Sequence, residues 1–149
     1  MTRLTIAIPN YNGGKNLQRA IESCKKIKIP LEDYEILIAD NCSTDNSIDI
    51  INELNNEFSN LVLIENKENV GRIQNWNVCL ENAKGKFLIF LFSNDIINDQ
   101  NNIHEILEIL DKDEKISIGF SSLLKKEIDN SYIKKSFSDK IIECPSNLF

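Results

Sequence analysis

Side chains that could bind a polar ligand occur in four short segments of this chain. The segments are residues 10–12, residues 40–45, Gly71 with Arg72, and residues 93–95. Together they offer carboxylates, carboxamides and one guanidinium, which hold ligands through hydrogen bonds and ion pairs. The single histidine, His104, is expected in a helix remote from all four, which argues against a cysteine–histidine nucleophile. These residue types therefore favour ligand binding.

Each of these segments lies beyond an apolar run of strand-like composition. The expected strands are residues 4–8, 34–39, 61–64 and 87–92, with a fifth at 116–123. Between them, apolar residues at helical spacing predict helices within residues 17–27, 48–58, 73–83 and 103–110. The unbroken apolar run 87–92 is typical of a central strand covered on both faces.

The alternation of strand and helix predicts an α/β fold. Repeats of this kind imply a mostly parallel, Rossmann-like sheet with right-handed crossovers and helices on both faces. Ligands in such sheets bind at the carboxyl ends of the strands, near the point where the strand order reverses. All four polar segments are expected at that edge, and this coincidence is the main evidence for a binding site.

The signatures of several common α/β proteins are missing from the sequence. The loop after the first strand reads Pro9-Asn10-Tyr11-Asn12-Gly13-Gly14, without the Gly-x-Gly-x-x-Gly spacing of dinucleotide-binding folds. Neither a P-loop nor a Gly-x-Ser-x-Gly nucleophile elbow occurs. What remains is one carboxylate after the second expected strand, Asp40, and one after the fourth, Asp95.

The composition limits the classes of binding partner and the cellular compartment that are expected for this chain. A net charge of -6 argues against nucleic acid as a partner, because phosphate recognition needs a dense stripe of Lys and Arg. The short basic clusters at 25–28 and 125–135 are interpreted as solvated faces or as a membrane or partner patch. The four cysteines form no Cys-x-x-Cys pair, so thiols in a reducing cytosol are expected instead of a zinc site. No signal peptide or membrane-spanning run is recognised.

Four motifs occur in order between about residues 3 and 125. They are Ile8-Pro9-Asn10-Tyr11-Asn12; Asp40 followed by Ser43-Thr44-Asp45; Asn69-Val70-Gly71-Arg72 with Asn75-Trp76-Asn77; and Ala83-Lys84-Gly85-Lys86 leading to Phe92-Ser93-Asn94-Asp95. In type, order and spacing they resemble the motifs of family 2 glycosyltransferases, which have the GT-A fold. Any one motif alone would be weak evidence for this resemblance, but the four motifs together are specific to the family.

The resemblance implies roles in binding a nucleotide-sugar. Asp40 would accept a hydrogen bond from the imide N–H of uracil, with a helix or turn cap as the alternative. Pro9 and Tyr11 would shape the wall around base and ribose, although a core tyrosine is the other interpretation. Arg72 would neutralise the diphosphate or lie at the surface. The expected nucleotide-binding set also includes Asn12, Asn77 and Asn94.

The resemblance also implies a divalent cofactor. Asp95 would ligate Mg²⁺ or Mn²⁺ between the two donor phosphates, since one or two carboxylates often suffice for such an ion. Asn94 stands where the family commonly has aspartate, and the lost charge predicts weaker metal binding. Asp45 is expected to cap a helix, Trp76 to lie in the core, and Cys42 and Cys79 to be packing residues.

The implied activity is inverting transfer of a sugar from a UDP-sugar to a glycan or lipid-linked acceptor in surface polysaccharide synthesis. Residues 1–149 are expected to form the nucleotide-sugar-binding GT-A domain and to lack most of the acceptor-binding portion. The catalytic base is expected beyond residue 149. The chain is expected in the cytoplasm, where peripheral association with the inner face of the cell membrane and a homo-oligomer are both compatible with it. A non-catalytic nucleotide-sugar-binding module is the alternative.

Overall fold

The computed structural model describes residues 2–98, 100–112, 123–126 and 132–135. The chain divides into two compact units, Met1–Gln100 and Asn101–Phe149, which are described separately. The first unit contains all four polar segments, so it is the unit in which a site must be sought.

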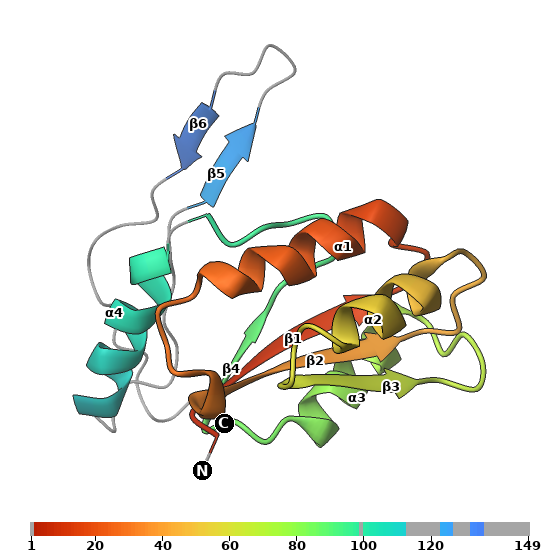
Figure 1. Ribbon diagram of the computed structural model, residues 1–149, viewed down its shortest axis with the longest axis horizontal. Helices are drawn as coiled ribbons and strands as arrows, with labels where there is room; N and C mark the ends of the chain where they lie inside the picture. The colour runs from red at the N-terminus through yellow and green to blue at the C-terminus, as the bar shows by residue number, and fades with distance from the viewer. Residues whose placement is uncertain (1, 99, 113–122, 127–131, 136–149) are drawn as a thin grey trace. The chain divides into compact units, whose positions relative to one another are not determined.

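A four-stranded parallel sheet forms the centre of the first unit (Figure 1). The strands, in the spatial order β3-β2-β1-β4, are β1 (Leu4–Asn10), β2 (Tyr34–Asp40), β3 (Leu61–Glu65) and β4 (Phe87–Phe90). Every residue of β2 is buried, and in β1 only Pro9 is partly exposed. The register pairs Asn10 with Asp40, which brings the polar carboxyl ends of β1 and β2 to the same level.

The helices lie on both faces of this sheet, as the sequence predicts. α1 (Gly14–Ser23) and α2 (Ser47–Asn55) lie on one face, and α3 (Arg72–Asn82) packs on β1 and β2 from the other (Figure 1). Right-handed crossovers require this arrangement, because the chain moves from β1 to β3 in one direction and then returns past β1 to reach β4. The strand order therefore reverses between β1 and β4.

Several boundaries differ from the sequence prediction, among them the end of α2, which lies at Asn55 and not at residue 58. The first helix ends at Ser23 and continues to Lys26 only as the 3-10 helix η1 (Cys24–Lys26); a second, η2 (Leu31–Asp33), precedes β2. The strand expected at 87–92 is shorter, because β4 ends at Phe90; it pairs with β1 and has half-buried side chains, and its central position stays a prediction. Its apolar run instead supplies aromatic rings, Phe90 and Phe92, that contact Trp76 of α3.

The amino end of the sheet is closed by a buried carboxylate. Glu35 accepts hydrogen bonds from Thr5 Oγ1 at 2.6 Å and from the backbone N–H of Lys84 at 2.7 Å. Thr5 Oγ1 in turn accepts from the N–H of Gly85 at 2.9 Å. A Cβ on Gly85 would lie 2.4 Å from the backbone nitrogen of Thr5, so the turn before β4 requires glycine.

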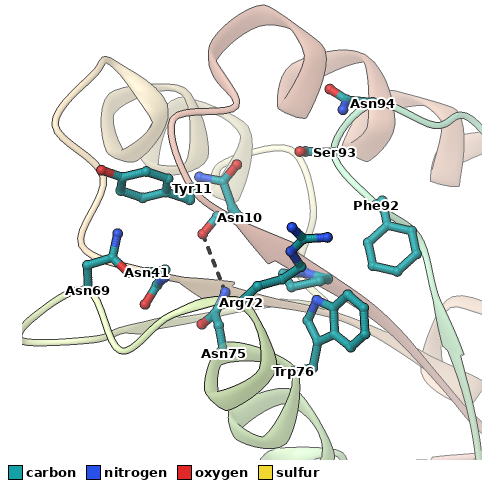
Figure 2. A pocket seen from close by; sticks show the side chains of 11 residues that line it. Asn10, Tyr11, Asn41, Asn69, Arg72, Asn75, Trp76, Phe92, Ser93 and Asn94 are labelled. Carbon is teal, nitrogen blue, oxygen red and sulfur yellow. Dashed lines mark hydrogen bonds between the residues drawn. The ribbon is translucent and has the colours of Figure 1, made fainter.

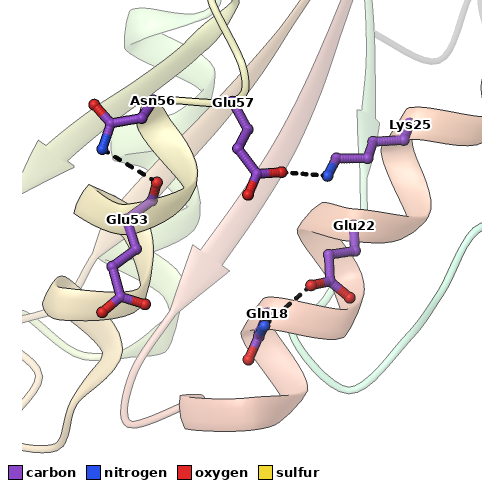
Figure 3. Close-up of polar contacts among 6 residues, drawn as sticks. All are labelled: Gln18, Glu22, Lys25, Glu53, Asn56 and Glu57. Carbon is purple, nitrogen blue, oxygen red and sulfur yellow. Dashed lines mark hydrogen bonds and ion pairs between the residues drawn. The ribbon is translucent and has the colours of Figure 1, made fainter.

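Exposed polar contacts join the helices on the α1 face (Figure 3). Lys25 forms an ion pair with Glu57 at 2.5 Å and lies over the ring of Phe58, 4.9 Å from its centroid. Gln18 donates to Glu22 one turn later on α1. About half of both charged side chains is exposed, so the ion pair adds little stability. This part of the basic cluster at 25–28 is a solvated surface with an acidic neighbour.

The second unit contributes α4 (Gln100–Lys112) and an antiparallel pair, β5 (Leu123–Lys126) with β6 (Tyr132–Lys135). Leu123 lies opposite Lys135 in that pair. Apart from Leu123, the predicted fifth strand at 116–123 lies outside the described residues. Among the helices that the structure describes, none has both the length and the apolar character needed to cross a membrane.

Candidate functional site

The carboxyl ends of β1 and β2 are joined by a buried pair of polar side chains. Asn10 and Asp40 are each 1% exposed, and Asn10 Nδ2 donates to Asp40 Oδ1 at 2.7 Å. Ser43 adds two bonds to the same carboxylate, from its hydroxyl at 2.6 Å and from its backbone N–H at 2.8 Å. A buried carboxylate needs such donors to offset its lost hydration. Asp40 therefore holds the loop that follows β2.

Asn12 joins the loops that follow β1 and β2. Its Oδ1 accepts from the N–H groups of Thr44 at 2.8 Å and of Asp45 at 3.3 Å, while its own N–H donates to Ser43 Oγ at 2.9 Å. Asn12 has a φ of 52°, a left-handed conformation that asparagine tolerates better than most residues. Asp45 Oδ1 accepts from Ser47 N–H at 3.0 Å at the start of α2, but the N-cap residue of this helix is Asn46, so Asp45 is not the expected cap.

A second set of asparagines attaches α3 and the loop after β3 to the same edge. Asn75 is 3% exposed, and its Nδ2 donates to the carbonyl oxygens of Ala39 at 2.9 Å and Asn10 at 3.4 Å (Figure 2). Asn66 donates to Asn75 Oδ1 at 2.9 Å. Asn41 donates to Asn69 at 2.8 Å and accepts from Val70 N–H at 2.9 Å. These carboxamides fix the loop position from which Arg72 begins α3.

These loops surround a cavity of about 570 Å³ at the ends of β1 and β4, where the strand order reverses (Figure 2). Its size lies within the range of small-molecule sites. The lining residues come from the ends of β1 and β2, the start of α3 and the segment after β4: Pro9, Asn10, Tyr11, Asn41, Asn69, Arg72, Asn75, Trp76, Phe92, Ser93 and Asn94. A cavity at this place in a parallel α/β sheet defines a ligand-binding domain of the doubly wound class.

Four of the residues predicted from the sequence to bind nucleotide line the cavity: Pro9, Tyr11, Arg72 and Asn94. Arg72 is exposed and has no hydrogen-bond or ion-pair partner among the described residues, so its guanidinium is available to an anionic ligand. Tyr11 is 51% exposed, which places its ring against the cavity and outside the core.

The other predicted residues do not line the cavity. Asn12 and Asp40 lie behind it, in the loop contacts described above. Asn77 is exposed on α3 and donates to Gln74 at 2.6 Å, because its position on the helix directs it away from Asn75 and Trp76. Asp95 is exposed beyond Asn94, in a turn closed by its N–H to the carbonyl of Phe92 at 2.8 Å.

The polar segments predicted at this edge include Asn10, Asn41 and Ser93 without an individual role, and no ligand role is predicted for Asn69, Asn75, Trp76 or Phe92. The structure places all seven in the lining. Trp76, expected in the core, is only partly buried. Its spacing of four residues from Arg72 was an available signal, since such residues share a helix face. Cys42 is likewise exposed and not a packing residue. Burial raises the pKa of Cys79 to about 11, which leaves it an unreactive thiol.

The oxygen-bearing side chains after β4 were tested for their fit to a divalent cation. Asn94 lines the cavity and accepts from Asn16 Nδ2 at 3.4 Å, and the carboxylate of Asp95 has no partner among the described residues. In the part of the chain that the structure describes, no group of three His, Cys, Asp or Glu could hold a metal unaided. These residues fit an ion that takes its remaining ligands from phosphates and water, as Mg²⁺ commonly does.

Comparison with known proteins gives the family. The Glycosyl transferase family 2 sequence profile matches residues 5–144. A poly(ribitol-phosphate) beta-glucosyltransferase of Bacillus spizizenii is 34% identical over 99 residues, which are 66% of this chain and 16% of that protein. A UDP-Glc:alpha-D-GlcNAc-diphosphoundecaprenol beta-1,3-glucosyltransferase of Escherichia coli is 30% identical over 140 residues, 92% of this chain and 49% of that protein. The chain therefore belongs to glycosyltransferase family 2.

Solved structures agree with this assignment. The Staphylococcus aureus protein TarS, crystallised as residues 1–349 with UDP-GlcNAc, matches with a TM-score of 0.68 and 28% identity over 74% of this chain and 32% of that one. A mannosyltransferase of Pyrobaculum calidifontis, solved with GDP-Man and Mn²⁺, has a TM-score of 0.71 at 19% identity, over 76% of this chain and 33% of that one, and supports the GT-A fold alone. The chain spans less than half the length of each of these relatives.

Proposed function

We propose that the cavity is the donor site of a glycosyltransferase that takes a UDP-sugar. The observation that carries this proposal is the convergence of Tyr11, Arg72 and Asn94 on one cavity from three separate loops. Tyr11 offers a flat face for a base, Arg72 a positive fork for phosphates, and Asn94 an oxygen at the far end. The TarS structure with UDP-GlcNAc, at 28% identity, supports the choice of donor class.

Asp40 acts at the base of the donor and Asp95 at its diphosphate in this proposal. Asp40 Oδ2 has one hydrogen bond, from Ser43 N–H, so an acceptor position is left for the imide of uracil beside Pro9. Asp95 and Asn94 would hold Mg²⁺ or Mn²⁺ together with the donor phosphates. The ion, when bound, supplies positive charge that stabilises the departing nucleoside diphosphate.

The acceptor and the setting follow from the relatives. The glucosyltransferase of E. coli is named for a diphosphoundecaprenol-linked acceptor, and the Bacillus enzyme for poly(ribitol-phosphate). We propose a glycan or lipid-linked acceptor of surface polysaccharide, and inverting transfer in line with the beta-linkages in those names. Work on such an acceptor would bring the protein to the inner face of the cell membrane from the cytoplasm.

Calorimetry of UDP binding, with and without Mn²⁺, tests the donor site. Wild-type protein is expected to bind UDP more tightly with Mn²⁺, and Asp95→Ala should remove that gain. Arg72→Ala should weaken binding by about 1.5 kcal/mol, roughly tenfold, because it removes a charge-assisted hydrogen bond to phosphate. Lys84→Ala, which removes an exposed cation from the opposite end of the sheet, is the matched control and should bind as wild type. Absence of UDP binding with metal present would contradict the proposal.

A further inference from the structure

One wall of the cavity is aromatic, and neither the base nor the phosphates of a nucleotide account for it. Trp76 of α3 and Phe92, just after β4, lie together on the side away from Tyr11 (Figure 2). Their ring centroids are 5.4 Å apart, with 45° between the ring planes. Phe92 keeps 39% of its surface exposed. Aromatic rings that line a cavity commonly hold the apolar face of a ligand.

A third ring supports this wall from behind. Phe90 is stacked on Phe92 with 5° between the planes and 6.1 Å between the centroids, and Trp76 lies 6.1 Å from it at 42°. Phe90 does not line the cavity. Rings packed on one another have little freedom left to lose, so a ligand that covers Trp76 and Phe92 meets a surface already in place.

The position of the wall indicates which part of a donor it meets. Phe92 is followed directly by Ser93 and Asn94, whereas Tyr11 and Asn69 lie at the other end of the cavity (Figure 2). With the base against Tyr11 and the diphosphate between Arg72 and Asn94, the group beside the aromatic wall is the one beyond the diphosphate. Phosphate is a poor match for an aromatic face, which carries partial negative charge.

We propose that Trp76 and Phe92 form the subsite for the pyranose ring of the donor sugar, an inference that rests on the proposed function. One face of a hexopyranose presents C–H bonds with slight positive charge, and these complement the negative face of an aromatic ring. The hydroxyl groups at the sugar's edge remain free to meet polar groups and water. The subsite therefore takes the hexopyranose of the donor.

The test compares UDP, UDP-glucose and UDP-GlcNAc by calorimetry with Mn²⁺ on wild type, Trp76→Leu and Phe92→Leu. Both variants are expected to lose about three- to tenfold in affinity for at least one UDP-sugar and to keep wild-type affinity for UDP. Phe90→Leu is the control, since it thins the same cluster without changing the lining. Thermal unfolding of all three variants shows that they fold.

The chain has one tryptophan, so its fluorescence gives a second measurement on the unmodified protein. UDP-sugar is expected to change the emission of Trp76 beyond the change caused by UDP. Equal losses for UDP and UDP-sugars in the variants would overturn the subsite, because the rings would then hold the base. Unchanged affinity for every ligand would overturn it too. Failure of wild type to bind UDP would instead overturn the proposed function, and the subsite with it.

Discussion

The two ends of the sheet use similar polar contacts for different purposes. At the amino end, Glu35, Thr5 and the Lys84–Gly85 turn bond to one another, and backbone fills the space so closely that a side chain on Gly85 would clash. At the carboxyl end, the buried side chains of Asn10, Asn41 and Asn75 also form hydrogen bonds, but they line a cavity of about 570 Å³. The polar contacts at the amino end stabilise the fold, whereas those at the carboxyl end also position side chains that could bind a ligand.

Within the carboxyl end itself, the buried side chains bond to the protein, whereas the exposed ones are available to a ligand. Asn10, Asp40 and Asn75 are at most 3% exposed and bond to other parts of the protein. Tyr11 and Arg72 are exposed at the cavity, and no hydrogen bond or ion pair from either side chain is found in the described part of the chain. Substitutions in the first group should reduce stability, and at Asp40 and Asn75 they should reduce UDP affinity as well, whereas those in the second group should reduce ligand binding alone.

The largest expected difference is in thiol reactivity. Burial raises the pKa of Cys24 from 9.0 to about 12, so near pH 8 its thiolate is roughly a thousandfold rarer than in the unfolded chain. Cys42, on the carboxyl-end loop, is exposed. In a Cys144→Ser background, a maleimide should label Cys42 of the native protein and reach Cys24 and Cys79 only after unfolding. Mass spectrometry of the labelled peptides checks this, and rapid native labelling of Cys24 would contradict it.

The raised pKa of Cys24 makes the free energy of unfolding depend on pH. The unfolded chain releases the Cys24 proton near pH 9, whereas the folded chain keeps it until about pH 12. The stabilisation is therefore fully present below pH 9 and is lost as the pH rises through that window. Cys24→Ala should flatten this alkaline loss relative to wild type in urea titrations.

At the amino end, Gly85→Ala should lower the free energy of unfolding by about 3 kcal/mol, because its Cβ would meet the backbone of Thr5 and Leu4. UDP affinity of the folded fraction should not change. Urea titration measures the loss. Gly71→Ala serves for comparison: no atom of the described residues lies within 4 Å of the added Cβ there, and the positive φ of 82° opposes the substitution. A Gly85→Ala protein of wild-type stability would contradict the close approach.

At the carboxyl end, Asn75→Ala should cost about 2 kcal/mol of stability, since it removes the bonds that the buried Nδ2 donates to the carbonyls of Ala39 and Asn10 and the bond that Oδ1 accepts from Asn66. UDP affinity should fall as well, because Asn75 positions α3 and lines the cavity. Asn82→Ala, on the same helix but exposed, removes only a bond to the Val78 carbonyl and should stay within about 0.5 kcal/mol of wild type. Equal losses from the two variants would contradict the buried role of Asn75.

The smallest effect is expected at Asn77. The resemblance predicts nucleotide binding for this residue, but its amide donates to Gln74 on the exposed side of α3. Asn77→Ala should therefore leave UDP affinity unchanged within twofold and alter stability by no more than about 0.5 kcal/mol. Calorimetry and thermal unfolding measure both. A clear loss of UDP affinity would restore the sequence-based interpretation.

The fold was largely predictable because strand and helix patterns are local. The apolar runs at β1 and β2 and the helical spacing in α1 and α3 each depend on residues close in sequence, and the right-handed crossover rule then orders them. The end of β4 at Phe90 was not predictable in this way. A run of Phe and Leu indicates that the side chains are buried. It does not indicate whether they pack beside another strand or against an aromatic side chain of a helix.

The site was predictable where exposed polar groups follow a strand, as at Tyr11 and Arg72. The sequence does not distinguish side chains that stabilise the loops from side chains that line the cavity, because this depends on which of two neighbouring side chains reaches the cavity. Asp40 and Asn41 are neighbours in the chain, yet only Asn41 belongs to the lining. Trp76 shows the same limit, since hydrophobicity alone does not distinguish a core ring from a cavity wall.

The most direct test of the central claim is a map of amide chemical shifts in the 15N-labelled protein on addition of UDP with Mg²⁺, which does not broaden the signals. We expect shifts at the carboxyl end, at residues 9–12, 40–41, 69–76 and 92–95, and none at Thr5, Glu35 or Gly85. An absence of shifts, or shifts confined to the amino end, would contradict the assignment of the cavity as a nucleotide-sugar site.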